Sequence, residues 1–196
     1  MNKKVFINCS YSQDHSYRLS SMIFLLRRLN IDVLLPDLSI KNDNALSLDI
    51  YEKLKESDAS IHDFDLSVND SRARFLVPMV YGLAKAIYLD EPNRIEPLLI
   101  STTSKDLYYD LIVDIIEEEK NYFKNETFIP KIYDLLLSHG LCSLYNVDDL
   151  YVDTVSFMKE ILELENTFRE HNEPLPIRNE LIVKLADQYI LDNHLN

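Results

Sequence analysis

The chain has 196 residues, of which 46% are hydrophobic, and its formal charge is −13 at pH 7. This length and hydrophobic content suffice for a packed core and exclude a disordered chain, and only two glycines exclude fibrous and low-complexity classes. The negative charge disfavours nucleic acid as a partner, because phosphate contacts dominate nucleic-acid affinity.

The N-terminal sequence and the cysteine content indicate a reduced, cytoplasmic protein. The chain passes from Met1 to an apolar run at residues 5–7 without the long apolar stretch of a secretion signal. No apolar run approaches the ~20 residues that span a bilayer. Cys9 and Cys142 are too few and too far apart for a metal cluster or a disulfide framework. We therefore expect a soluble cytoplasmic protein with no membrane segment, no metal site and no bound cofactor.

Strand-like and helix-like segments alternate through the first half of the chain. Short apolar runs, typical of buried strands, lie at residues 4–9, 32–35, 59–64 and 97–101. Apolar residues at helical spacing lie between them, at residues 14–30, 45–56 and 75–89. Such alternation implies parallel strands joined by right-handed crossovers, so we predict an α/β fold with a small parallel sheet flanked by helices.

The second half of the chain has a purely helical pattern. Apolar residues recur at intervals of three and four at residues 107–123, 129–137, 150–168 and 177–191. No further strand is indicated. The sequence therefore predicts an α/β domain at residues 1–103 and an α-helical C-terminal region at residues 104–196.

Polar residues follow each predicted strand. In an open parallel sheet, ligands bind beyond the carboxyl ends of the strands, so these residues are the candidates for a binding site. Hydroxyl, amide and carboxylate groups there can hydrogen-bond a sugar or an amide. Each of them can instead serve only as a helix cap, and both readings stay open. The candidates from these loops are Asn8, Ser10, Tyr11, Asp37, Asp63 and Asp65.

Four segments resemble a known family. They are Val5-Phe6-Ile7-Asn8-Cys9, Ile61-His62-Asp63-Phe64-Asp65-Leu66-Ser67, Ala73-Arg74-Phe75-Leu76-Val77-Pro78-Met79 and Gly82-Leu83. Over about residues 3–101 the chain is similar to bacterial proteins related to nucleoside 2-deoxyribosyltransferases and TIR domains. The resemblance implies a flavodoxin-like sheet with a pocket for a nucleoside, NAD or a nucleotide-derived molecule. It adds Arg74 and Tyr81 to the candidate ligand-binding residues.

The resemblance also implies N-glycosidic chemistry, in which a helix-borne glutamate stabilises the cationic sugar as the base leaves. Here the position of that glutamate is occupied by Val80, and no Asp or Glu occurs between Arg74 and Leu89. An apolar side chain supplies neither covalent nor electrostatic stabilisation. The sequence therefore favours a catalytically degenerate relative.

Three residues near the end of the third predicted strand keep an enzymatic alternative open. Asp63 and Asp65 can supply the missing negative charge, and His62 can act as a general acid or base. In the competing interpretation Asp63 braces the following loop, Asp65 is solvated and His62 is a hydrogen-bonded structural residue. Tyr81 likewise either stacks on a ligand or belongs to the core.

Three functions remain as hypotheses. The favoured one is a catalytically degenerate protein that binds a nucleotide or a nucleotide-derived signal, and family analogy suggests bacterial defence or stress signalling. The second is an active N-glycosidase or NAD-cleaving enzyme that uses Asp63, Asp65 or a residue from a neighbouring subunit. The third is a protein-interaction scaffold whose helical tail self-associates. We expect a homo-oligomer or a protein partner in addition to the small molecule.

Overall fold

The computed structural model describes residues 2–11, 16–64, 71–91, 93–100, 128–171, 173 and 179–195. The strands are β1 (Lys4–Asn8), β2 (Asp32–Leu34), β3 (Ala59–Asp63) and β4 (Leu98–Ile100). The helices are α1 (Ser16–Arg28), α2 (Asp43–Glu56), α3 (Ser71–Asp90), α5 (Phe128–Ser138), α6 (Val147–Glu170) and α7 (Asn179–Asp192). The helix predicted at residues 107–123 lies outside the described residues.

The four strands form one parallel sheet in the order β2-β1-β3-β4. Val5 of β1 lies opposite Val33 of β2 on one side and opposite Ala59 of β3 on the other. β3 in turn pairs with β4, with Ile61 opposite Leu98. The predicted α/β fold, with a small flavodoxin-like parallel sheet, flanking helices and a helical C-terminal region, is confirmed.

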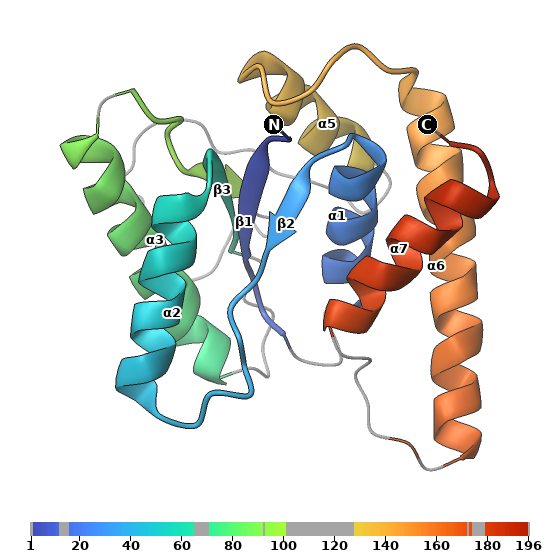
Figure 1. Cartoon of the computed structure of the whole chain (residues 1–196), viewed down its shortest axis with the longest axis horizontal. Coiled ribbons are helices and arrows are strands. Elements are labelled where there is room, and N and C mark those ends of the chain that lie inside the picture. Colours follow the sequence, from blue (N-terminus) through green and yellow to red (C-terminus); the bar gives the residue numbers. More distant parts are fainter. Residues whose placement is uncertain are drawn as a thin grey trace.

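Successive residues of β1 point to opposite faces of the sheet, as the strand period of two requires. Val5 and Ile7 belong to the hydrophobic cluster shared with α1, whereas Phe6 belongs to the cluster formed with α2 and α3. In Figure 1, α2 and α3 lie on one side of the sheet, and α1 lies on the other side together with α5, α6 and α7. The sheet is therefore the middle layer between two layers of helices.

Helix α1 is buried on nearly all sides. Its five consecutive residues from Met22 to Leu26 are fully buried. Because neighbouring helical residues point in different directions, the sheet alone cannot cover all five. The remaining cover comes from α5, α6 and α7, which pack against α1 and share its hydrophobic cluster. The predicted boundary near residue 103 stays a prediction, because residues 101–127 are not described.

Side-chain caps fix the starts of two helices, each earlier than apolar periodicity alone predicts. The Asn42 side chain accepts a hydrogen bond from the backbone N–H of Ala45 at 3.1 Å, so α2 begins at Asp43. The Asn146 side chain does the same for Asp148 at 3.0 Å at the start of α6.

In the part of the chain that the structure describes, no helix combines the length and apolarity needed to cross a membrane.

A cluster of three aromatic rings connects α1 with the C-terminal helices. Phe24 of α1 stacks on Phe157 of α6 with ring centroids 4.5 Å apart, and the edge of Tyr189 from α7 contacts both rings at 5.6 Å. Aromatic pairs of this geometry stabilise a core beyond their buried area. The C-terminal helices are thus held to the α/β layer by specific side-chain packing.

We predict that Phe157→Ala lowers the free energy of unfolding by about 3–5 kcal/mol, because it leaves a cavity in this cluster. Urea denaturation followed by circular dichroism measures the change. Leu162→Ala is the matched control, since Leu162 lies on the same helix and is 54% exposed. If the Phe157 variant instead lost part of its helix signal at low urea and the rest at the wild-type midpoint, α6 would not be packed as part of the main core.

Candidate functional site

The candidate site lies beyond the carboxyl ends of β1 and β3. The strand order places β2 on one side of β1 and β3 on the other, so the chain reverses its direction of travel across the sheet at this point. In parallel α/β sheets such a switch point forms the ligand crevice. Asn8 ends β1 and lies opposite His62 of β3, and Asp63 follows as the last residue of β3.

Asn8 and His62 form a buried hydrogen-bond network that connects β1, β3 and α3. The Asn8 Nδ2 donates to the backbone carbonyl of Val77 at 2.9 Å and also lies 2.7 Å from the His62 Nδ1. Because Asn8 is the donor, His62 Nδ1 accepts, and Nε2 carries the proton that it donates to Ser60 Oγ at 2.8 Å. Both ring nitrogens of His62 are therefore satisfied inside the protein.

His62 is neutral in the folded protein. Its side chain is fully buried, and burial lowers its pKa from the ordinary 6.5 to about 3. The ring also packs edge-on against Tyr81 of α3, with centroids 5.1 Å apart. This environment is that of a structural histidine, because a general acid or base works best when its pKa lies near the working pH.

Asp63 forms a bidentate ion pair with Arg18 of α1. The Arg18 Nε donates to Asp63 Oδ2 at 2.9 Å and Nη2 donates to Oδ1 at 3.0 Å. The pair is largely buried, with side-chain exposures of 12% for Arg18 and 3% for Asp63. The guanidinium also lies over the Phe128 ring, with Cζ 4.6 Å from its centroid. Asp63 thus braces the first turn of α1 against β3.

Arg18 is the residue of this site that the sequence analysis did not select. Its partner lies 45 positions away, so no local pattern indicates the pair. One signal was available, since Arg18 falls in the first turn of the helix that follows the first strand, the position at which a parallel sheet brings a side chain to the crevice. Apolar periodicity does not single it out, because it scores only the apolar residues of the helix, such as Leu19.

The other candidates at the end of β1 are enclosed by the protein. Ser10 is buried, and the Tyr11 hydroxyl donates to the backbone carbonyl of Ile7 at 2.7 Å. Burial raises the pKa of the Tyr11 hydroxyl well above its ordinary value. The pKa of the buried Cys9 thiol is also raised well above 9.0, chiefly by burial and also by the nearby Asp63 charge. Neither group is ionised at neutral pH, so neither is an activated nucleophile.

Asp37 lies in the loop after β2 and serves the local chain. Its carboxylate accepts hydrogen bonds from the Ser39 backbone N–H at 3.0 Å and from the Ser39 hydroxyl at 2.6 Å. These bonds lower the pKa of Asp37. Its own backbone N–H donates to Asp49 Oδ2 at 2.9 Å. Asp37 therefore stabilises its own loop as an Asx turn, whereas the cap of α2 is Asn42.

Position 80, where the resemblance implies a glutamate, lies on helix α3. Val80 is buried in the hydrophobic cluster with Phe6 and Leu46, on the side of the sheet that α2 covers. Tyr81 is 7% exposed and contacts His62 and Phe64 edge-on, so it packs beside the network as a core residue. Asp65 and the side chain of Arg74 lie outside the described part of the chain.

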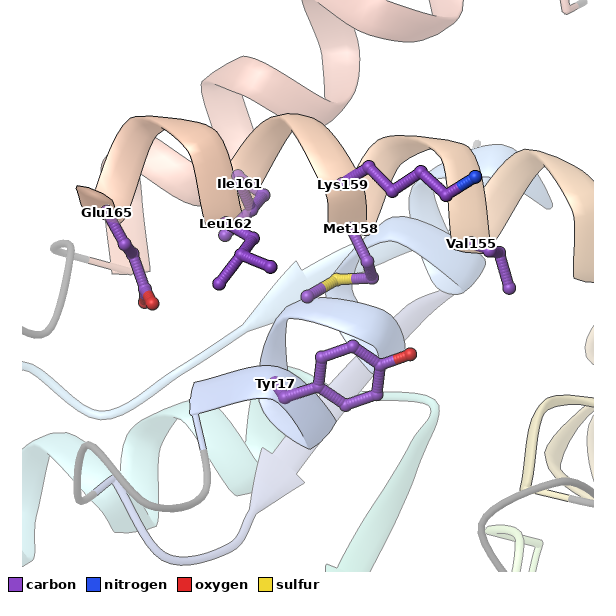
Figure 2. Close-up of a pocket in the computed structure, with 7 residues that line it drawn as sticks. All are labelled: Tyr17, Val155, Met158, Lys159, Ile161, Leu162 and Glu165. Carbon is purple, nitrogen blue, oxygen red and sulfur yellow. The ribbon is translucent and has the colours of Figure 1, made fainter. Parts of the chain in front are cut away.

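A separate hollow of about 200 Å³ lies between the start of α1 and the side of α6 that faces it. Figure 2 shows Leu162 and Met158 facing Tyr17 across it, with Glu165 at one end. Its lining is mainly apolar, so it suits an apolar group better than a sugar or a phosphate. Within the described residues, no group of three or more His, Cys, Asp or Glu side chains is placed to hold a metal ion.

Comparison with known proteins adds no assignment. The chain matches no protein-family model, and no curated protein matches it. The resemblance to nucleoside 2-deoxyribosyltransferases and TIR domains therefore stays a prediction carried by the segments quoted above. The arrangement of Asn8, Arg18, His62 and Asp63 at the carboxyl ends of β1 and β3 is the remaining basis for a functional proposal.

We predict that His62 makes the protein less stable in mild acid. Its folded pKa of about 3 lies below the unfolded value of 6.5, so below pH 6.5 the unfolded chain binds a proton that folded His62 does not. This contribution to stability is complete above pH 6.5 and is lost at up to about 1.4 kcal/mol per pH unit as the pH falls toward 3. Urea denaturation at pH 7.5, 6 and 5 measures it.

His62→Gln isolates this proton, because it removes the titrating group and should flatten the pH dependence in that window. Ile61→Val is the matched control. It changes a fully buried neighbour on the same strand and lowers stability by roughly 0.5–1.5 kcal/mol at every pH without altering the slope. An identical slope in wild type and His62→Gln would show that His62 is already protonated or accessible in the folded state.

Proposed function

We propose that the chain is a non-catalytic protein that binds a nucleotide or a nucleotide-derived small molecule in the crevice beyond β1 and β3. The strand order puts a topological switch point at β1 and β3, the place where parallel α/β sheets bind such ligands, and Arg18 and Asp63 are charged groups close to it. The resemblance to deoxyribosyltransferases and TIR domains supports the same ligand class. By family analogy, we also propose a role in bacterial defence or stress signalling.

The non-catalytic part of the proposal rests on two positions, Asp63 and Val80. Asp63 is engaged by both arms of the Arg18 guanidinium, and Val80 occupies the position of the family glutamate within an apolar cluster. A carboxylate that stabilises a cationic sugar must face the reacting carbon in a preorganised geometry. Asp63 would have to leave Arg18 before it could do so.

Arg18 is the proposed contact for the anionic part of the ligand. A guanidinium binds phosphate and carboxylate in the same planar, bidentate manner, so a ligand phosphate competes with Asp63 for it. This competition makes a distinctive prediction. Removing the negative charge of Asp63 should strengthen the binding of phosphorylated ligands relative to that of uncharged nucleosides.

The test uses purified wild type with NAD, AMP and unphosphorylated nucleosides, with binding followed by calorimetry and base release by chromatography. We expect binding without release of nicotinamide or a free base. Arg18→Met should abolish binding of the phosphorylated compounds. Asp63→Asn should strengthen it relative to the nucleosides, because it removes the competing negative charge.

Arg169→Gln is the matched control, since Arg169 is half-exposed near the end of α6, away from the sheet, and its loss should leave binding unchanged. Circular dichroism checks folding, because breaking a buried ion pair costs about 3–5 kcal/mol. Base release that disappears in Asp63→Asn would overturn the proposal and establish an N-glycosidase with a displaced carboxylate. Absence of both binding and release would favour the interaction scaffold.

A further inference from the structure

Helix α3 carries an apolar stripe along its solvent-exposed face. Phe75, Met79 and Leu89 are 69%, 56% and 72% exposed, and the exposed Gly82 and Ala86 lie between them. The spacing of these five residues is four, three, four and three, which keeps them on one face of a helix. We call Phe75, Met79, Gly82, Ala86 and Leu89 the α3 stripe. Large apolar side chains gathered on a surface in this way mark an interaction site.

The α3 stripe is also free of charge. From residue 75 to residue 89 the only charged residue is Lys85, which forms an ion pair with Glu96 of the same chain. The whole chain carries a formal charge of −13, so most pairs of its surfaces repel each other. Two copies that meet through the α3 stripe avoid placing carboxylates against one another.

The order of residues in the α3 stripe is self-complementary in the antiparallel direction. Phe75 lies seven residues before Gly82 and Leu89 lies seven after it, while Met79 lies three before and Ala86 four after. A two-fold axis at Gly82 therefore places Phe75 of one helix opposite Leu89 of the other. It places the long Met79 side chain opposite the small Ala86. Such pairing of one surface with itself is what an isologous dimer requires.

We propose that a second copy of this chain docks on the α3 stripe, with the two α3 helices antiparallel and crossing at Gly82. Glycine at the crossing point lets the two backbones approach closely, as small residues do at other helix crossings. Each helix then covers the exposed Phe75 and Leu89 of the other. This proposal does not depend on the proposed function.

The size of the surface predicts a weak dimer. A helix of 20 residues is about 30 Å long and about 10 Å wide, so one face offers less than the roughly 800 Å² per partner of a standard interface. A membrane surface is a poorer occupant, because interfacial helices combine an apolar face with many Lys and Arg residues. A basic peptide finds no carboxylate within the α3 stripe to pair with.

Sedimentation velocity over a range of protein concentrations tests the proposal, and we expect a monomer–dimer equilibrium. Gly82→Lys should abolish the dimer while the monomer stays folded, because a Cβ added at Gly82 meets no atom within 4 Å. It should also leave the thermal stability of the monomer intact or raised, since glycine is a poor helix former. Leu191→Lys is the matched control at a 60% exposed helical position on α7 and should dimerise like wild type.

Disulfide cross-linking tests whether the two-fold axis lies at Gly82. Gly82→Cys in a Cys142→Ser background should form a disulfide with itself on mild oxidation, because a residue on a two-fold axis meets its own copy. Leu191→Cys in the same background should not. A wild-type monomer at every concentration, a Gly82→Lys variant that still dimerises, or binding of the monomer to phosphatidylcholine–phosphatidylglycerol vesicles through the α3 stripe would each overturn the proposal.

Discussion

The burial of α1 on both of its long sides is the constraint on which the rest of the structure depends. Five consecutive fully buried residues, Met22 to Leu26, cannot all face one sheet. The sheet takes one side of the helix, and α6 and α7 take the other through Phe157 and Tyr189. Without the C-terminal helices this side of α1 would expose a large apolar surface to water. The helical C-terminal region is therefore part of the packing of the α/β layer.

The same helix also brings a positive charge to the carboxyl end of β3. Arg18 in the first turn of α1 pairs with Asp63 at the end of β3, and the ring of Phe128 at the start of α5 lies against its guanidinium. An ion pair buried to this degree gains little net stability, because both charges lose their hydration. Its bidentate geometry nevertheless fixes α1 relative to β3. A ligand that engages Arg18 would thus act on the contact between α1 and the sheet.

The sequence predicted what local patterns encode. Alternating apolar runs and helical spacing located all four strands and every described helix, and the early starts of α2 and α6 are set by the caps Asn42 and Asn146. Local patterns could not reveal the Arg18–Asp63 pair or the Asn8–His62 bond, whose partners lie 45 and 54 positions apart. A structural role for His62 was one of two interpretations of the sequence, and the full burial of its ring is the physical reason to prefer it.

The packing of α3 accounts for the apolar side chain at position 80. On its inner face, the Val77 carbonyl accepts a hydrogen bond from Asn8, and Tyr81 packs against His62. Val80 lies in the hydrophobic cluster that contains Phe6 and residues of α2. A glutamate at position 80 would be buried there without a polar partner, at a cost of several kcal/mol. Valine is thus the residue that this packing selects. With position 80 in the core, α3 contacts the ends of β1 and β3 through the Val77 carbonyl and the Tyr81 ring.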